Sequence, residues 1–363
     1  MKIIHVCRLS SSSSNGIKSV LTNLVPEQEA LGNTLIVFNL INNEKKIFEN
    51  EIFIAGYKEF KNEINNLSPS VVIFHGGYEL KYYLYSWLLK KNNIPYIIVP
   101  HGGTSKHNLH KKRILKTIVN VLFTHRFITN AAGVSFLNEG EWKDSIFFND
   151  IRHYTIIPNG ISEIAQKPFV NRSESTIHFI YLARIDFEHK RPDVLLKAVE
   201  KLHAKHPEID FDFHFYGGRY DPSIVQKFKD MVKATKGPVF YHGEVFGNDK
   251  EIAFSESDIY VLTSLYEGMP LTVLEALSYG KPCIVTPQTN MADMIMNNHA
   301  GWVTESDEDS ISKILYKAYV EFKEKRDEYI DNALNAIRPY RWDAIAKKSI
   351  EEYARLIEKT EII

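Results

Sequence analysis

The sequence has little cysteine, almost no net charge and no long apolar run. Its two cysteines, Cys7 and Cys283, both lie in apolar, strand-like segments, which suit core thiols in a reducing compartment better than a disulfide. The 44 basic and 45 acidic residues leave a formal charge of -1, which argues against nucleic-acid binding through an overall positive field. Any basic surface must therefore be local.

No apolar run approaches the length of about 18 to 20 residues that a membrane-spanning helix needs. The opening residues 1–7 are too short for the apolar core of a secretory signal, and we expect them to form a first strand instead. These absences predict a cytoplasmic location. The length of 363 residues suits two domains, each able to bury its own core.

Two sequence patterns with defined chemistry are also missing. No Gly-x-Gly-x-x-Gly with an acidic residue downstream follows the first strand, which disfavours a nicotinamide dehydrogenase. No Asp-x-Asp pair stands at a strand end to hold a divalent ion, since Asp210 and Asp212 fall at a strand start. We therefore expect neither a metal ion nor a cofactor.

The sequence does contain two series of apolar strands that alternate with amphipathic helices. Continuous apolar runs suit parallel strands covered on both faces, and this order predicts doubly wound α/β domains with a ligand crevice at the carboxyl ends of the strands. The runs are 2–7, 34–40, 70–75 and 95–101, then 177–183, 212–218 and 239–245. We predict Rossmann-like domains over residues 1–161 and 162–340, with a polar linker at 162–175 and a closing helix in 341–363.

The prediction of function depends most on residues 264–280. Glu267 precedes a Gly-Met-Pro turn, and an apolar helix containing Glu275 then runs to Gly280. The backbone N–H groups at the helix start suit a phosphate, and the two carboxylates can hold two parts of one ligand. Two solvated helix charges are the alternative, but Glu275 lies among core-type residues, where an unpaired carboxylate is costly.

Two cations, Arg184 and Lys190, follow the first strand of the second series. Positive charge at a strand end and on the next loop can neutralise a diphosphate, and the guanidinium fork is well shaped for it. The alternative is an ordinary pair of surface charges.

Two strands of the first series end in histidine, His75 and His101, and Gly-Gly follows each one. Parallel strands place both imidazoles at one crevice. The alternative for each is a hydrogen-bonded structural residue, and for His75 both interpretations stay open.

Residues 106–126 are expected to form a helix with one apolar face and basic residues near its start. A solvated surface helix explains this pattern. A platform for phospholipid headgroups or for a diphosphate-lipid-linked sugar also explains it, and that interpretation places the protein on the inner face of the cell membrane.

The stretch 258–286, with glutamates 267 and 275, resembles the glutamate-x7-glutamate signature of retaining GT-B glycosyltransferases, the family 4 or glycosyl transferases group 1 class. Residues 183–196 resemble that family's diphosphate-binding segment, with Arg191 where glycine is usual, and residues 100–103 resemble its strand-end histidine. The resemblance implies a GT-B architecture: two Rossmann-like domains facing across a cleft, the first for the acceptor and the second for the nucleotide-sugar, with a last helix crossing back to the first.

The resemblance also implies residue roles. Glu267 and His101 would be catalytic, contacting the transferred sugar from the donor and acceptor sides. Arg184, Lys190 and the helix start would hold the diphosphate, and Glu275 the ribose hydroxyls. The donor-binding set is Arg184, Lys190, Glu275, Gly16, Gly268, Met269, Pro270, Leu271 and Val245, the last near the nucleobase.

The implied reaction transfers a hexose-type sugar from a nucleotide-diphosphate donor to a saccharide or polyprenyl-diphosphate-linked acceptor, with retention and without metal, in cell-surface polysaccharide synthesis. Changing Glu267 or Lys190 to alanine is expected to abolish transfer and leave folding intact. A GT-B-fold sugar-nucleotide epimerase, with differently arranged carboxylates, is an alternative. A non-catalytic partner protein on the same fold is another, but it would be expected to lack some of His101, Arg184, Lys190 and Glu267.

Overall fold

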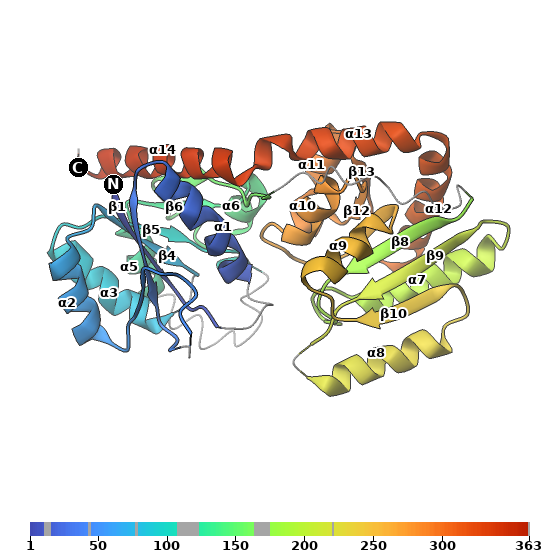
Figure 1. Ribbon diagram of the computed structural model, residues 1–363, viewed down its shortest axis with the longest axis horizontal. Coiled ribbons are helices and arrows are strands. Elements are labelled where there is room, and N and C mark those ends of the chain that lie inside the picture. Colours follow the sequence, from blue (N-terminus) through green and yellow to red (C-terminus); the bar gives the residue numbers. More distant parts are fainter. Residues whose placement is uncertain are drawn as a thin grey trace. The chain divides into compact units, whose positions relative to one another are not determined.

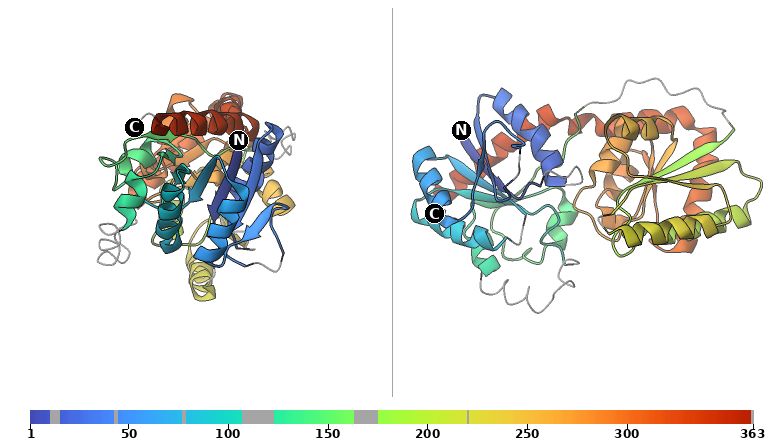
Figure 2. Two further views of the ribbon diagram at one scale, coloured as in Figure 1. Left: turned by 90° about the vertical axis from the view of Figure 1, so that its left-hand side faces the viewer. Right: turned by 60° about the horizontal axis from the view of Figure 1, so that its bottom comes forward.

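A computed structural model describes residues 1–10, 16–42, 45–76, 79–106, 123–162, 175–219 and 221–361. The chain forms two compact units, one of residues 1–162 with 340–363 and one of residues 163–339 (Figure 1, Figure 2). None of the helices in these described ranges is both long and apolar enough to cross a bilayer. Most of the expected linker lies outside the described residues.

The first unit is built on a parallel sheet. Its described strands are β1 (Lys2–Cys7), β2 (Thr34–Asn39), β3 (Glu51–Phe53), β4 (Val71–His75), β5 (Tyr96–Val99), β6 (Gly133–Phe136) and β7 (Tyr154–Ile156). They pair in the order β3-β2-β1-β4-β5-β6-β7. The winding reverses between β1 and β4, and a doubly wound domain places its ligand crevice at the carboxyl ends of the strands near such a point.

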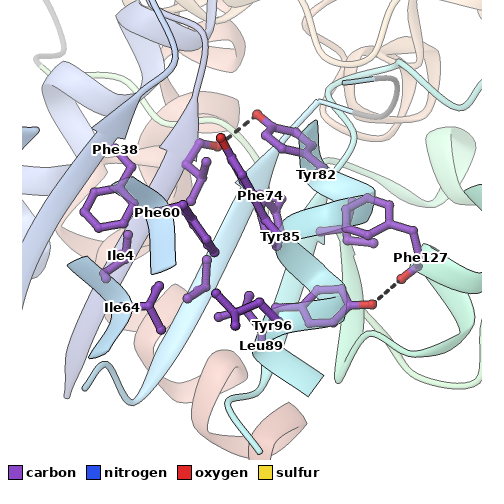
Figure 3. Packing of buried hydrophobic residues seen from close by; sticks show 14 of the residues in the cluster. Ile4, Phe38, Phe60, Ile64, Phe74, Tyr82, Tyr85, Leu89, Tyr96 and Phe127 are labelled. Carbon is purple, nitrogen blue, oxygen red and sulfur yellow. Dashed lines mark hydrogen bonds between the residues drawn. The ribbon is translucent and has the colours of Figure 1, made fainter. Parts of the chain in front are cut away.

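One face of this sheet carries an aromatic core, part of which Figure 3 shows. The helices that cover it are α2 (Tyr57–Leu67), α3 (Leu80–Lys91) and α5 (His125–Thr129). Phe60 of α2 stacks on Tyr85 of α3 with ring centroids 3.9 Å apart. The buried hydroxyls of Tyr82 and Tyr96 donate to the carbonyls of Val6 and Phe127, so these rings fill the core without losing hydrogen bonds.

On the first unit, α1 (Gly16–Ala30) packs beside α14 (Trp342–Glu361), as Figure 1 shows. Although α14 comes from the last part of the chain, it belongs to this unit. A Cβ placed on Gly133 would lie 2.7 Å from the Leu356 side chain, and one placed on Gly160 would lie 2.5 Å from the Trp342 ring. Both glycines therefore allow α14 to approach closely.

The second unit is also built on a parallel sheet. Its described strands are β8 (Ile177–Leu182), β9 (Phe211–Tyr216), β10 (Val239–Gly243), β11 (Ile259–Leu262), β12 (Cys283–Val285) and β13 (Gly301–Val303), in the order β10-β9-β8-β11-β12-β13. Its described helices are α7 (Pro192–Lys205), α8 (Pro222–Ala234), α9 (Gly247–Ser255), α10 (Leu271–Ser278), η3 (Pro287–Thr289), α11 (Ala292–Asn297), α12 (Glu308–Glu324) and α13 (Arg326–Ile337).

The two faces of β8 and β9 differ in character. Phe213 and Phe215 pack toward α8, where Phe228 meets Phe215 at a centroid distance of 5.3 Å. The side chains that alternate with these phenylalanines, and point to the other face, include Asp212 and His214. Each unit is a doubly wound parallel α/β domain, so the predicted fold class is confirmed.

Candidate functional site

An ion pair between Lys190 and Glu267 lies at the centre of the candidate site in the second unit. Lys190 Nζ donates to Glu267 Oε1, and His189 Nε2 lies 3.4 Å from the same oxygen. The Lys190 and Glu267 side chains are 10% and 11% exposed. Burial alone would raise the pKa of Glu267, but the charge of Lys190 and the contact with His189 lower it to about 2. The carboxylate is therefore charged at neutral pH.

Hydrogen bonds tie together the loops that follow β8, β11 and β12. Leu265 N donates to His189 O, and Glu267 N donates to Gln288 O, both at 2.9 Å. Asn290 Nδ2 donates to Glu267 O at 2.7 Å. Because these three strands are neighbours in the sheet, Glu267 is held at the carboxyl edge where doubly wound domains bind ligands.

The helix expected after Glu267 is α10. It begins at Leu271, with Pro270 as its N-cap, and Gly280 beyond its end has the left-handed φ of 68° that the sequence predicts. The first N–H groups of a helix have no acceptor inside the helix, so the start of α10 offers donors to an anion. Gly268 and Met269 form the turn between Glu267 and this helix start.

Glu275 of α10 has one carboxylate oxygen paired and the other buried without a partner. Lys250 of α9 donates to Oε1 at 2.6 Å, whereas Oε2 accepts no hydrogen bond from any described residue. Burial raises the pKa of Glu275, and Lys250 opposes that shift. A buried carboxylate oxygen without a donor is costly, and hydroxyl groups of a ligand would satisfy it.

Arg184 lies at the carboxyl end of β8, as expected, with an exposed side chain that takes no part in the Lys190–Glu267 pair. Two residues later in the same loop, buried Asp186 pairs with Arg219 at 2.6 Å and accepts a hydrogen bond from His189 N at 3.1 Å. Burial opposes the shift, but Arg219 and the loop N–H groups lower the pKa of Asp186. Asp186 therefore shapes the loop that carries Lys190, a role that the sequence did not reveal.

Two other predicted donor residues belong to other segments of the chain. Val245 is half-buried between β10 and α9. Gly16 is exposed and is the first residue of α1, in the first unit. The expected basic helix at 106–126 lies largely outside the described residues, which resume at Phe123.

In the first unit, His75 and His101 contact each other at the carboxyl ends of β4 and β5. His75 Nδ1 is 2.9 Å from His101 Nε2, and His75 Nε2 is 2.8 Å from His5 Nδ1. Burial lowers the pKa of His5 and of His101 to about 4, and it also lowers the pKa of His75. The three imidazoles are therefore neutral at pH 7. His5, hidden in an otherwise apolar strand, was not singled out by the sequence.

Glu141 of α6 (Glu139–Asp144) holds the loop that carries His101. One of its carboxylate oxygens accepts from Gly102 N, and the other accepts from Leu137 N at 2.7 Å. Burial raises the pKa of Glu141 to about 7, although both hydrogen bonds oppose the shift. His101 has a left-handed φ of 51°, a conformation that non-glycine residues adopt at some energetic cost and often near functional sites.

One group of described side chains has the composition of a metal site: His178, Asp212 and His214. Their donor atoms lie within 4.8 Å of one another. The group stands on the body of β8 and β9 rather than at the carboxyl ends, where the loop of Glu267 lies. It is therefore separate from the candidate site.

Residues 176–319 match the family model described as "Glycosyl transferases group 1". Over 176 residues the chain is 26% identical to the GtfA subunit of the Streptococcus pneumoniae UDP-N-acetylglucosamine–peptide N-acetylglucosaminyltransferase, covering 47% of this chain and 33% of that protein. Over 71 residues it is 41% identical to the Escherichia coli UDP-Gal:alpha-D-GlcNAc-diphosphoundecaprenol alpha-1,3-galactosyltransferase, covering 19% and 18%. The chain thus spans only a third or less of the length of these two relatives.

A crystal structure of a glycosyltransferase from Rickettsia africae has a TM-score of 0.76 to this chain at 15% identity, covering 98% of both chains. At that identity the likeness shows the fold, and the architecture is GT-B. The family match covers the loops that carry Lys190 and Glu267 and the helix that carries Glu275. Over residues 176–319 the chain is therefore similar to the glycosyl transferases group 1 family.

Proposed function

We propose that the protein is a glycosyltransferase that moves a hexose-type sugar from a nucleotide-diphosphate donor to a saccharide or lipid-linked acceptor, with retention of anomeric configuration. The second unit would hold the donor. The family match to this unit supports the proposal, as do the printed names of the two relatives, both of which are transferases of UDP-sugars.

The observation that carries this proposal is the buried pair of Lys190, on the loop after β8, and Glu267, on the loop that leads into α10. A cation and a carboxylate that are in contact, with a helix start directly after the carboxylate, suit a diphosphate bonded to a sugar. The unpartnered Oε2 of Glu275, further along the same helix, suits a hydroxyl-bearing group such as ribose. No single one of these features would require a sugar nucleotide, but together they provide for each of its parts.

The mechanism that we propose follows from the negative charge that develops on the departing diphosphate. As the bond between sugar C1 and the phosphate oxygen breaks, negative charge grows on the diphosphate, and Arg184, Lys190 and the start of α10 stabilise it. The acceptor oxygen attacks C1 from the same face, and its proton passes to the departing phosphate oxygen. Glu267, already paired with Lys190, orients the sugar hydroxyls rather than attacking C1, and His101 is the first unit's contact with the sugar.

For the acceptor, we propose a saccharide carried on a polyprenyl diphosphate during cell-surface polysaccharide synthesis. The name of the Escherichia coli relative, which acts on a diphosphoundecaprenol-linked sugar, supports this choice. Work on such an acceptor at the inner face of the cell membrane would use the basic residues in 106–126, so neutralising Lys111, Lys112 and Arg113 is the test of membrane association.

Changing Glu275 to glutamine is expected to raise the donor KM roughly tenfold and to leave kcat within about twofold. The reason is that ribose hydroxyls keep the same contact in the bound donor and in the transition state. Steady-state kinetics with varied donor measures both constants, with exposed Glu328→Gln as a matched control. An unchanged KM in Glu275→Gln would remove Glu275 from the donor site.

The function itself is tested by a thermal-shift screen of nucleotide-sugars, followed by transfer assays with membrane extract. We expect one nucleotide-sugar to raise Tm, transfer to persist in excess EDTA, and the product to keep the donor's anomeric configuration by NMR. Donor isomerisation without an acceptor would favour the epimerase alternative. Absence of binding by every nucleotide-sugar would favour the non-catalytic alternative.

A further inference from the structure

We infer that a chain of hydrogen bonds from α14 to His101 decides which ring nitrogen of His101 carries the proton, leaving Nδ1 as an acceptor for a substrate hydroxyl. The members of this relay are Ser349, Gln28, His5, His75 and His101. The identity of the substrate rests on the proposed function. The inferred proton positions depend only on hydrogen bonds within the first unit.

The direction of the relay is set at its buried end. Ser349 Oγ donates its one proton to Ala346 O at 2.7 Å, so it can only accept from Gln28. Gln28 Nε2 donates to it at 2.8 Å, which turns the amide oxygen toward His5. Gln28, His5 and Ser349 are all 0% exposed, so a reversed amide would set its oxygen against the serine oxygen and leave two buried acceptors without a donor.

Donor and acceptor are then fixed at each further hydrogen bond of the relay. The amide oxygen of Gln28 lies 3.0 Å from His5 Nε2 and can only accept, so that nitrogen carries the proton. A neutral imidazole has a single N–H, so His5 Nδ1 accepts from His75 Nε2. In the same way His75 Nδ1 accepts from His101 Nε2, and the lone pair of His101 Nδ1 is left for a ligand.

Two features keep this arrangement in place at neutral pH. Burial lowers the pKa of each imidazole, so the rings stay uncharged and hold one proton each. The Glu141–Gly102 bond fixes the backbone directly after His101. A fixed acceptor at the strand end favours a sugar hydroxyl and disfavours a ligand group that is itself only an acceptor.

The proton positions can be read without any substrate. Long-range 1H–15N spectra of the full chain, labelled at histidine, distinguish protonated from bare ring nitrogens. Single His→Gln variants assign the three rings. We expect the Nε2–H tautomer for His5, His75 and His101 at pH 7, and a proton on His101 Nδ1 would overturn the inference.

Ser349→Ala tests the direction from a residue far from the chemistry. Ser349→Ala removes the acceptor that holds the Gln28 NH2 away from His5. We expect the amide to turn its NH2 toward His5, which reverses every step and moves the His101 proton to Nδ1. We expect this change in the spectrum, and a roughly tenfold lower kcat/KM for transfer because one acceptor becomes a donor. Ser349→Thr keeps a hydroxyl and should restore both, and Ser312→Ala, a buried serine of the second unit, should change neither.

The two readouts separate the relay from the proposed function. An unchanged His101 tautomer in Ser349→Ala overturns the relay. A reversed tautomer with an unchanged kcat/KM supports the relay and overturns the role given to His101 in transfer.

A different cluster carries a second inference: we propose that His178, Asp212 and His214 bind one divalent transition-metal ion. Asp212 Oδ1 is 2.7 Å from His178 Nδ1 and 3.1 Å from His214 Nε2. His178 and Asp212 are registered partners on neighbouring parallel strands, so the sheet holds the group. Two imidazoles and one carboxylate favour ions such as Zn²⁺, Co²⁺ or Ni²⁺ over Mg²⁺.

The surroundings suit an ion as well. Bonds of about 2.0–2.2 Å would place tetrahedral ligands roughly 3.3 Å apart, so the two distances from Asp212 Oδ1 need only a small opening. The other nitrogen of His214 lies 2.8 Å from His242 Nε2, the kind of outer contact that orients a ligating histidine. The three side chains are 13% to 24% exposed, so an ion can reach them from solvent.

This site is tested by titrating the full chain with Co²⁺ and measuring visible absorption. The protein should carry no polyhistidine tag, because a tag would bind the ion itself. We expect ligand-field bands that saturate at one ion per chain and are lost in Asp212→Asn and His214→Ala. His242→Ala should weaken binding by about 10- to 100-fold. His206→Ala, which removes a histidine paired with Glu208 elsewhere, should leave the bands unchanged. No bands, or bands that persist in Asp212→Asn, would overturn the proposal.

Discussion

Replacing Lys190 with methionine is expected to destabilise the second unit by about 3–5 kcal/mol and to reduce sugar transfer at least 100-fold. Lys190 is the cation that keeps buried Glu267 charged, so its removal leaves an uncompensated carboxylate. The same change removes positive charge from the proposed diphosphate site. Urea unfolding measures the first effect, and transfer at saturating donor measures the second.

The double variant Lys190→Met with Glu267→Gln separates the two effects. It removes both charges, so most of the stability should return while transfer stays lost. The pair of exposed Lys197 and half-buried Glu308, at 3.2 Å, is the control, and Lys197→Met should cost less than about 1 kcal/mol. Full transfer in Lys190→Met would contradict the proposed site. The buried pair also revises the expectation from sequence that alanine at either position leaves folding intact.

Lowering the pH from 7 to 5 is expected to reduce the free energy of unfolding of the first unit by about 2 kcal/mol through His5 alone. Burial lowers the pKa of His5 from 6.5 to about 4, so below pH 6.5 the unfolded chain binds more protons than the folded one. The stability is therefore present above pH 6.5 and is lost as the pH falls toward 4. His75 and His101 shift in the same direction and add to the loss.

Glu141 has the opposite effect on the pH dependence of stability, so the test must account for it. Its pKa is raised to about 7, so its contribution grows as the pH falls from 7 toward 4.5. The test is therefore a difference: urea unfolding at pH 7, 6 and 5 for the wild type, for His5→Asn and for His206→Asn, which changes a half-buried histidine of the second unit. His5→Asn should flatten the pH dependence relative to both others. Equal slopes in all three proteins would contradict a neutral buried His5.

The sequence predicted the parts of the site that lie close together along the chain. The loop with Glu267, the helix with Glu275 and the end at Gly280 follow from local signals, namely proline, glycine and apolar spacing, and the structure places them as expected. Lys190 could be proposed from charge alone. That it pairs with Glu267, 77 residues later, depends on β8 and β11 being neighbours, which no local pattern encodes.

The residues that sequence reasoning missed act through contacts between distant segments. Gln28 meets Ser349 across 321 residues, and neither looks unusual on its amphipathic helix. Glu141 looks like a charge near a helix start, yet one of its oxygens binds the backbone N–H of Gly102, 39 residues earlier. His178 and His214 lie in strands 36 residues apart and meet at Asp212 only through strand register. Contacts of this kind can be identified only once the fold is known.

The placement of α14 has a consequence for the order in which the protein is made. The second unit is continuous from residue 163 to residue 339, whereas the first unit draws its last helix from residues beyond 340. The ribosome therefore synthesises all residues of the second unit before it adds α14. At that stage Gln28 lacks its partner Ser349, and Gly133 lacks its neighbour Leu356. The later unit of the chain can complete its core before the earlier one, and a nascent chain stalled near residue 340 would expose the α1 surface that α14 normally covers.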